Sequence, residues 1–210
     1  MAIPFVELNK INPSSIIELF ELELTVGLHI PSGNPDNLDT IFRFHGGANL
    51  NNFGQVILNG NSYQRVAVKV EGFEDTSKGT IARPTLTFSN LGGITKDTTV
   101  MTMTDFLNIV NKVTTGNDLL NAKVTRLMPL ASALDDANFI SGSNPFNTSV
   151  DTTNGTSDRL QDRIYFIDRK AVENRQVVQF ELVGELDMQN KKIPARIVTR
   201  ELFPSAGTFF

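Results

Sequence analysis

The feature that most constrains the fold is an alternation of apolar and polar side chains with a period of two residues. It is clearest in three segments, 18–26, 84–89 and 176–188. The apolar face of the first segment is formed by Phe20, Leu22, Leu24 and Val26. Because successive side chains of a strand point to opposite faces, this pattern predicts antiparallel strands with one buried and one solvated face.

Shorter apolar runs predict further strands, and turn residues separate them. These strands are expected at 41–45, 55–58, 66–70, 122–130, 163–168 and 193–200. Asn59-Gly60 lies between two of them and indicates a type I′ turn, in which both central residues need a positive φ. Pro84 fits the first position of its strand, since proline cannot donate to a ladder. The pattern predicts a mainly β fold, an antiparallel sandwich or barrel of about nine to eleven strands.

A single segment is expected to be helical. Apolar residues recur there at helical spacing, at Met103, Phe106, Leu107, Val110 and Val113. Thr104 or Asp105 is the expected N-cap, and Gly116-Asn117 the expected stop. A helix of about three turns with one apolar stripe should pack against a face of the sheet.

The chain is expected to divide into an extended arm, residues 1–15, and a β-rich domain, residues 16–210. Two related halves of this domain, split near 92–120, are an open alternative. The arm is either a frayed terminus or a segment that docks on a neighbouring subunit. Its apolar residues Ile3, Phe5, Val6 and Leu8 motivate the second interpretation. A polar loop at 141–158 is predicted to be mobile and, like the arm, to become ordered on assembly.

The residues that usually carry chemistry are few and scattered. The two histidines, His29 and His45, lack the spacing of a metal motif, and strand-edge positions are expected for them. Asp135-Asp136 is expected to cap a turn or loop, because neighbours in an extended chain cannot share one substrate atom. The loops 32–39 and 141–158 lack the spacing of a calcium loop. We predict no catalytic, cofactor-binding or metal-ligating residue, no cofactor and no enzymatic activity.

Charge and composition exclude several other classes of protein. The net charge of −4, with scattered basic residues, argues against a sequence-independent nucleic-acid binder. The N-terminus lacks the pattern of a signal peptide. The apolar run 16–30 is interrupted by three glutamates, so no membrane span is expected. The sequence contains no cysteine, which excludes disulfides and thiolate-ligated metals.

Three segments resemble, in order, the minor tail protein L family of lambda-type long-tailed phages. They are KGTIARPTLTFSNLGG at 78–93, LDDANFISG at 134–142 and KIPARI at 192–197. The resemblance covers roughly residues 16–198. Members of this family are expected to carry a cysteine-rich C-terminal extension that holds an iron–sulfur cluster. Because the sequence has no cysteine, the cluster is not carried over.

The resemblance implies a structural function in a siphovirus virion. The protein would have a tail-tube-like fold and form a ring at the tail tip, after synthesis in the host cytoplasm. As a homotrimer it would join the six-fold tail tube, or distal tail ring proteins, to a three-fold hub that carries host recognition. DNA would at most pass through the lumen. These are expectations from the family.

Two other functions remain open on the residues alone. The first is a β-sandwich binding module that recognises a sugar or a protein partner. Such a module should expose an aromatic cluster, and the chain has no tryptophan and only Tyr63 and Tyr165 as tyrosines. The second is an enzyme, which would need a role for His29 or His45.

Overall fold

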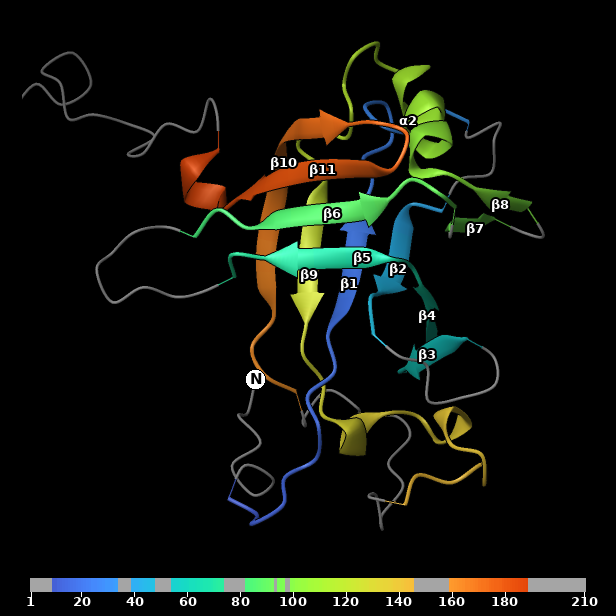
Figure 1. The fold of residues 1–210 in the computed structure, drawn as a ribbon, viewed down its shortest axis with the longest axis vertical. Coiled ribbons are helices and arrows are strands. Elements are labelled where there is room, and N and C mark those ends of the chain that lie inside the picture. Colours follow the sequence, from blue (N-terminus) through green and yellow to red (C-terminus); the bar gives the residue numbers. More distant parts are fainter. Residues whose placement is uncertain are drawn as a thin grey trace, which may run out of the picture.

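The structure, a computed structural model, describes residues 9–33, 39–47, 54–73, 82–92, 94–96, 99–145 and 159–188. These residues form eleven strands, one α-helix and three short 3-10 helices (Figure 1). The strands are β1 (Leu19–Glu23), β2 (Ile41–His45), β3 (Gln55–Leu58), β4 (Asn61–Arg65), β5 (Val68–Glu71), β6 (Thr85–Ser89), β7 (Ile94–Lys96), β8 (Thr99–Met101), β9 (Lys123–Leu127), β10 (Arg163–Glu173) and β11 (Val177–Val183). The helices are α2 (Met103–Asn111), η1 (Ala131–Ala133), η2 (Asp136–Asn138) and η3 (Glu185–Asp187).

Nine of the strands form one sheet in the order β3-β4-β2-β1-β9-β10-β11-β6-β5, and β7 pairs with β8 separately. The predicted mainly β class with one packed helix is confirmed. The predicted antiparallel pairing holds for every described pair except β2 with β4, which run parallel. This exception arises because β3 and β4 form a hairpin of their own, and β4 rather than β3 joins β2.

The sheet folds over on itself at its longest strand. The first residues of β10 pair with β9 and the remainder with β11. Two register shifts, at Ile167/Arg169 and Lys170/Val172, interrupt the second pairing. Bulges of this kind bend a strand and increase its twist. As a result β11, β6 and β5 cross in front of β9 and β1, which Figure 1 shows as horizontal arrows over vertical ones.

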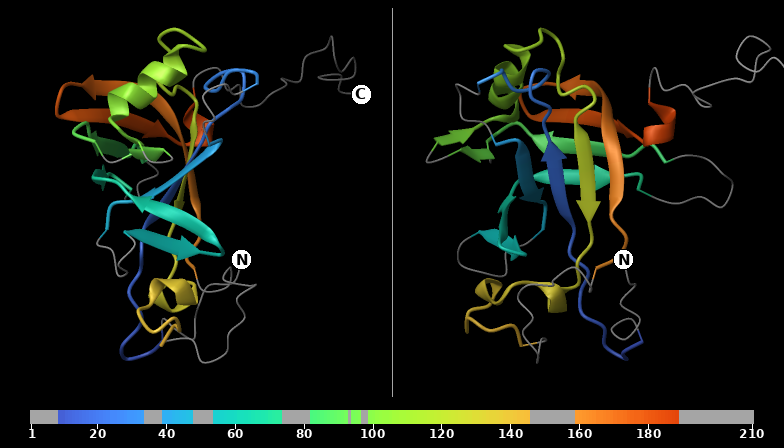
Figure 2. Two further views of the ribbon diagram at one scale, coloured as in Figure 1. Left: turned by 90° about the vertical axis from the view of Figure 1, so that its right-hand side faces the viewer. Right: turned by 180° about the vertical axis from the view of Figure 1, so that it is seen from behind.

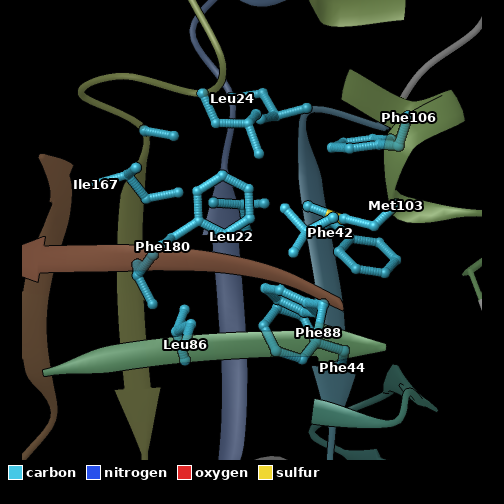
Figure 3. Close-up of a cluster of buried hydrophobic side chains, with 14 of the residues drawn as sticks. Leu22, Leu24, Phe42, Phe44, Leu86, Phe88, Met103, Phe106, Ile167 and Phe180 are labelled. Atoms are coloured by element: carbon cyan, nitrogen blue, oxygen red, sulfur yellow. The ribbon is translucent and has the colours of Figure 1, made fainter. Parts of the chain in front are cut away.

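The main core lies between the two crossing halves of the sheet. Phe88 of β6 contacts Phe44 of β2 at 5.2 Å between ring centroids and Phe180 of β11 at 6.1 Å. Figure 3 shows these side chains in one cluster between the crossing strands, with Phe106 and Met103 of α2 at the end near Phe42. The alternation predicted at 84–89 is confirmed, since Leu86 and Phe88 are buried.

The sheet is not closed into a barrel. Its two outermost strands are β3 and β5, although β4 and β5 are separated by only Val66 and Ala67. The amide of Val66 donates to the carbonyl of His45 at 3.0 Å, so the chain leaves β2 here and crosses to the other half of the sheet. The predicted strand at 66–70 is therefore wrong in its extent, because this crossing divides it.

Two other predicted strands end earlier than the alternation suggests. β1 ends before Val26, which is exposed, because the carbonyl of Thr25 accepts from the amides of Leu28 and His29 in a tight turn. β11 ends at Val183, and Leu186 lies exposed in η3. The strands at 41–45 and 55–58 are confirmed with the predicted bounds. The strand predicted at 193–200 lies outside the described residues.

The predicted helix is present, but both of its ends differ from the prediction. Thr102 is the N-cap, and Asp105 completes a capping box by accepting from the Thr102 amide. The hydrogen bonds with Thr102 lower the pKa of Asp105. The helix ends at Asn111, before the predicted stop at Gly116. The buried residues Met103, Phe106, Leu107 and Val110 confirm the predicted apolar stripe.

Candidate binding groove

A large apolar groove of about 1030 Å³ opens between the β5 edge of the sheet and the segment 131–145. One wall is formed by Ile16 and Ile17, directly before β1, and the opposite wall by Val68 and Val70 of β5. Phe139 and Ile140, directly after η2, also line it. Concave, mostly apolar sites of this size are typical of ligand and peptide binding.

The position of β5 in this groove depends on a glycine. A Cβ atom at Gly46 would lie 2.7 Å from the carbonyl oxygen of Val68, which is too close for any other residue without a backbone shift. Gly46 therefore lets the end of β2 approach β5 closely. β5 pairs with β6 along one edge and is the last strand of the sheet among the described residues, and its Val68 and Val70 side chains line the groove.

The segment around η2 is held in place by hydrogen bonds to the β3–β4 hairpin. Asn59 and Gly60 form its two-residue turn with φ values of 52° and 73°, which confirms the predicted type I′ geometry. The Asp135 carboxylate accepts from both turn amides, at 2.9 Å from Asn59 and 2.7 Å from Gly60. Asn138 accepts from the Ile57 amide at 2.7 Å and donates to the Ile57 carbonyl at 2.6 Å. We call these contacts the hairpin clasp.

The clasp explains the acidic pair identified in the sequence. Asp135 caps the hairpin turn, and Asp136 accepts from the amide of Asn144 at 2.8 Å. The buried Asn144 side chain donates in turn to the carbonyls of Ser132 and Leu134. The predicted turn and loop role of Asp135-Asp136 is confirmed, and the two carboxylates face different partners.

The two histidines are both buried, but they occupy different places in the fold. His29 accepts from the Thr25 amide through Nδ1 at 2.9 Å, so Nε2 carries the proton and donates to the Leu120 carbonyl at 2.9 Å. Burial lowers the pKa of His29. Both ring nitrogens are thus used by the backbone and are not open to a metal. His45 lines the groove, and the prediction of strand-edge positions holds for it alone, at the end of β2.

Among the described residues, the buried tyrosine of β4 also has a structural partner. Tyr63 is buried and donates to the Glu21 carboxylate at 2.8 Å, and burial raises its pKa. Glu21 also accepts from Arg43 at 3.1 Å. No group of three or more histidine or acidic side chains that could hold a metal ion occurs among the described residues. In the same part of the chain, no helix is long and apolar enough to cross a membrane.

Sequence reasoning did not find the groove. Its walls come from 15–18, 68–70 and 139–141, which are far apart in the sequence and meet only through the sheet topology. The sequence holds one weak signal of the groove, since Ile140 is an apolar residue inside a polar segment. The structure leaves this side chain 89% exposed. Most of the predicted loop at 141–158 and of the loop at 32–39 lies outside the described residues.

The sequence also matches a known family over most of its length. A model of the family described as phage minor tail protein L matches residues 37–206. The matched region contains the β6 segment, the hairpin clasp and β5, whose Val68 and Val70 line the groove.

Proposed function

The chain belongs to the phage minor tail protein L family, and we propose that it forms a ring at the tail tip that joins the tail tube to the central hub. The family match carries the structural tail function itself. The ring, its position at the tip of a siphovirus tail and its homotrimeric state are the proposal. A trimer with tube-like domains would adapt the six-fold tube to a three-fold hub.

The sheet edges support assembly into a ring. β3 and β5 are the outermost strands of the nine-stranded sheet. Within the sheet, each pairs with a neighbouring strand along one edge only. Such edges are templates for pairing with another chain. At β3 the hairpin clasp already bonds the outward amide and carbonyl of Ile57, so β5 is the remaining outer strand among the described residues.

The described chemistry supports a non-enzymatic role. A catalytic histidine needs a free ring nitrogen and access to substrate, whereas His29 is buried with both nitrogens bonded to backbone groups. Asp135 and Asp136 are used by the hairpin clasp and the Asn144 amide. We therefore propose that the protein has no cofactor and no activity. Its partners are copies of itself, tail tube or distal tail ring proteins, and the hub protein.

A β-sandwich binding module is the second candidate, favoured by the apolar groove. A protein partner fits this groove better than a sugar, because both tyrosines are buried and none of the large exposed apolar residues in the described ranges is aromatic. Sugar sites usually need an aromatic surface with polar groups around it. In this alternative the protein would act as a monomer with a peptide ligand.

Measuring the mass of the assembled species and imaging the tail tip test the proposal together. We expect purified protein mixed with tail tube and hub proteins to form a complex containing three copies, and the tail tip to show a three-fold ring. A chain that stays monomeric with these partners, or that is missing from purified tails, would contradict the ring.

A further inference from the structure

We propose that the groove binds the N-terminal segment Ile3–Leu8 of a second copy of this chain, in extended conformation against the Val68 and Val70 side chains of β5. The inference deepens the proposed ring and rests on it, because it assumes self-association. It assigns both a binding site and an occupant: a short apolar peptide in extended conformation.

The groove has the chemistry that such a peptide needs. Val68 and Val70 alternate with Lys69 and Glu71 along β5, so one face of the edge strand lines the groove and is apolar. Ile16, Phe139 and Ile140 line the groove from the other elements. Pockets that take alternate side chains give such a groove its specificity for an extended peptide.

The N-terminal segment supplies matching side chains. Ile3 and Phe5 would share one face of an extended chain, and Val6 and Leu8 the other. Pro4 fits an extended peptide, because its ring fixes φ at a value that extended backbone allows. An extended segment with two apolar faces buries most apolar surface when one face enters the groove and the neighbouring copy covers the other.

The tether lies in the right place. The described chain runs from Asn9 to Ser15, which itself lines the groove. Ser15 is fixed there, since its carbonyl accepts from the Ala131 amide at 2.8 Å, and Ser14 and Ser132 share a hydrogen bond of 3.1 Å. Leu8 precedes Ser15 by seven residues, which span at most about 25 Å when extended.

The exposure of the tether favours a second copy over the same one. Residues 9–12 are all exposed, and Ile11 has no cover at all. Figure 2 shows these residues at the far end of the molecule from α2, beyond the 3-10 helices η1 and η2. An apolar residue in such a position gains cover when a neighbour lies against it. In a closed ring every groove would receive one arm and every arm would find one groove.

Disulfide trapping tests the arrangement cleanly, because the natural chain has no cysteine. One full-length chain carries Phe5→Cys and a second, with a different tag, carries Ile140→Cys. The matched control replaces Ile140→Cys by Leu91→Cys, which is similarly exposed and does not line the groove. Under mild oxidation we expect mixed disulfide dimers several-fold more often with Ile140→Cys than with Leu91→Cys.

The double variant Phe5→Cys/Ile140→Cys in one chain distinguishes the two routes. Intrachain disulfides at high dilution, without mixed dimers, would overturn the proposal in favour of an arm that covers its own groove. Equal trapping by Ile140→Cys and Leu91→Cys would also overturn it, as expected if another tail protein fills the groove.

A second measurement separates this proposal from the ring itself. A chain lacking residues 1–8 is mixed with tail tube and hub proteins, and its copy number and its presence in tails are measured. We expect loss of the three-copy complex with no loss of folded protein by circular dichroism. If the shortened chain still forms a ring, the arm proposal fails and the proposed function stands. If the natural chain forms no ring either, the proposed function fails first.

Discussion

The core between the crossing halves of the sheet and the groove beside β5 are lined by the same kinds of side chain, yet the described residues fill only the core. In the core, Phe88 contacts both Phe44 and Phe180, and α2 covers one end. In the groove, Val68, Phe139 and Ile140 leave a space of about 1030 Å³. Folding thus buries the apolar side chains of the core and leaves apolar side chains lining an open space in the groove.

The difference separates residues that stabilise the monomer from residues available for assembly. A filled core contributes to the free energy of unfolding through transfer and packing, and loses both when a side chain is truncated. An open groove contributes little until a partner fills it. Substitutions in the two regions should therefore change different measurements.

The largest effect is expected for Phe88→Ala. Phe88 is 2% exposed and contacts rings from two other strands. We expect the free energy of unfolding to fall by about 3–5 kcal/mol, as is typical of buried phenylalanine truncations. Urea denaturation followed by circular dichroism measures it, with Leu91→Ala as the exposed control. A loss no larger than that of the control would show that the two halves of the sheet do not share this core.

The next effect is expected at the boundary between the regions, for Asn138→Ala. This change leaves the amide and carbonyl of Ile57 without the Asn138 side chain. Unsatisfied buried groups cost about 1–3 kcal/mol each, and partial access to water places the loss at the lower end. Asn138→Asp is the matched variant, since it keeps the acceptor for the amide and loses the donor. Equal stability of the natural chain and both variants would show that the clasp does not hold the hairpin.

The contrast between core and groove also marks what sequence could predict. Alternation identified β6, and short apolar runs between turn residues identified β2 and β3. Asn59-Gly60 identified its turn through the positive φ that it needs. Local patterns failed where a distant contact decides. β5 is separated from β4 because the Val66 amide donates to His45, and no periodicity encodes that partner.

The groove could not be predicted for the same reason. Its residues lie on elements that the fold of β10 and the close approach at Gly46 bring together. The acidic pair was predictable as a cap from its residue types, but its partner, the turn at Asn59, is about 75 residues away. Residue type thus predicted the role of Asp135, and only topology showed what it holds.

A smaller change in the free energy of unfolding, dependent on pH, is expected from His29. Burial lowers its pKa in the folded state below the ordinary 6.5, so the folded form stays neutral while the unfolded form gains a proton. The neutral imidazole contributes fully to the free energy of unfolding above pH 6.5. This contribution is lost as the pH falls toward the folded pKa, by no more than about 1.4 kcal/mol per pH unit. Urea denaturation at pH 8, 7, 6 and 5 measures it. His29→Gln should show a shallower acid loss than the natural chain, and equal slopes would contradict a neutral buried imidazole.

The smallest effect on stability, and the sharpest test of the comparison, is expected for Ile140→Ser in the groove. Because this side chain is 89% exposed in the monomer, the free energy of unfolding should change by no more than about 0.5 kcal/mol. Leu91→Ser, at a similar exposure outside the groove, should behave the same way in denaturation. The two variants should separate only when copies associate, since Ile140 then becomes a buried contact and Leu91 does not. Analytical ultracentrifugation should show weaker self-association for Ile140→Ser alone. A large loss of stability in the monomer would mean that the groove belongs to the folding core, and the distinction between the two regions would fail.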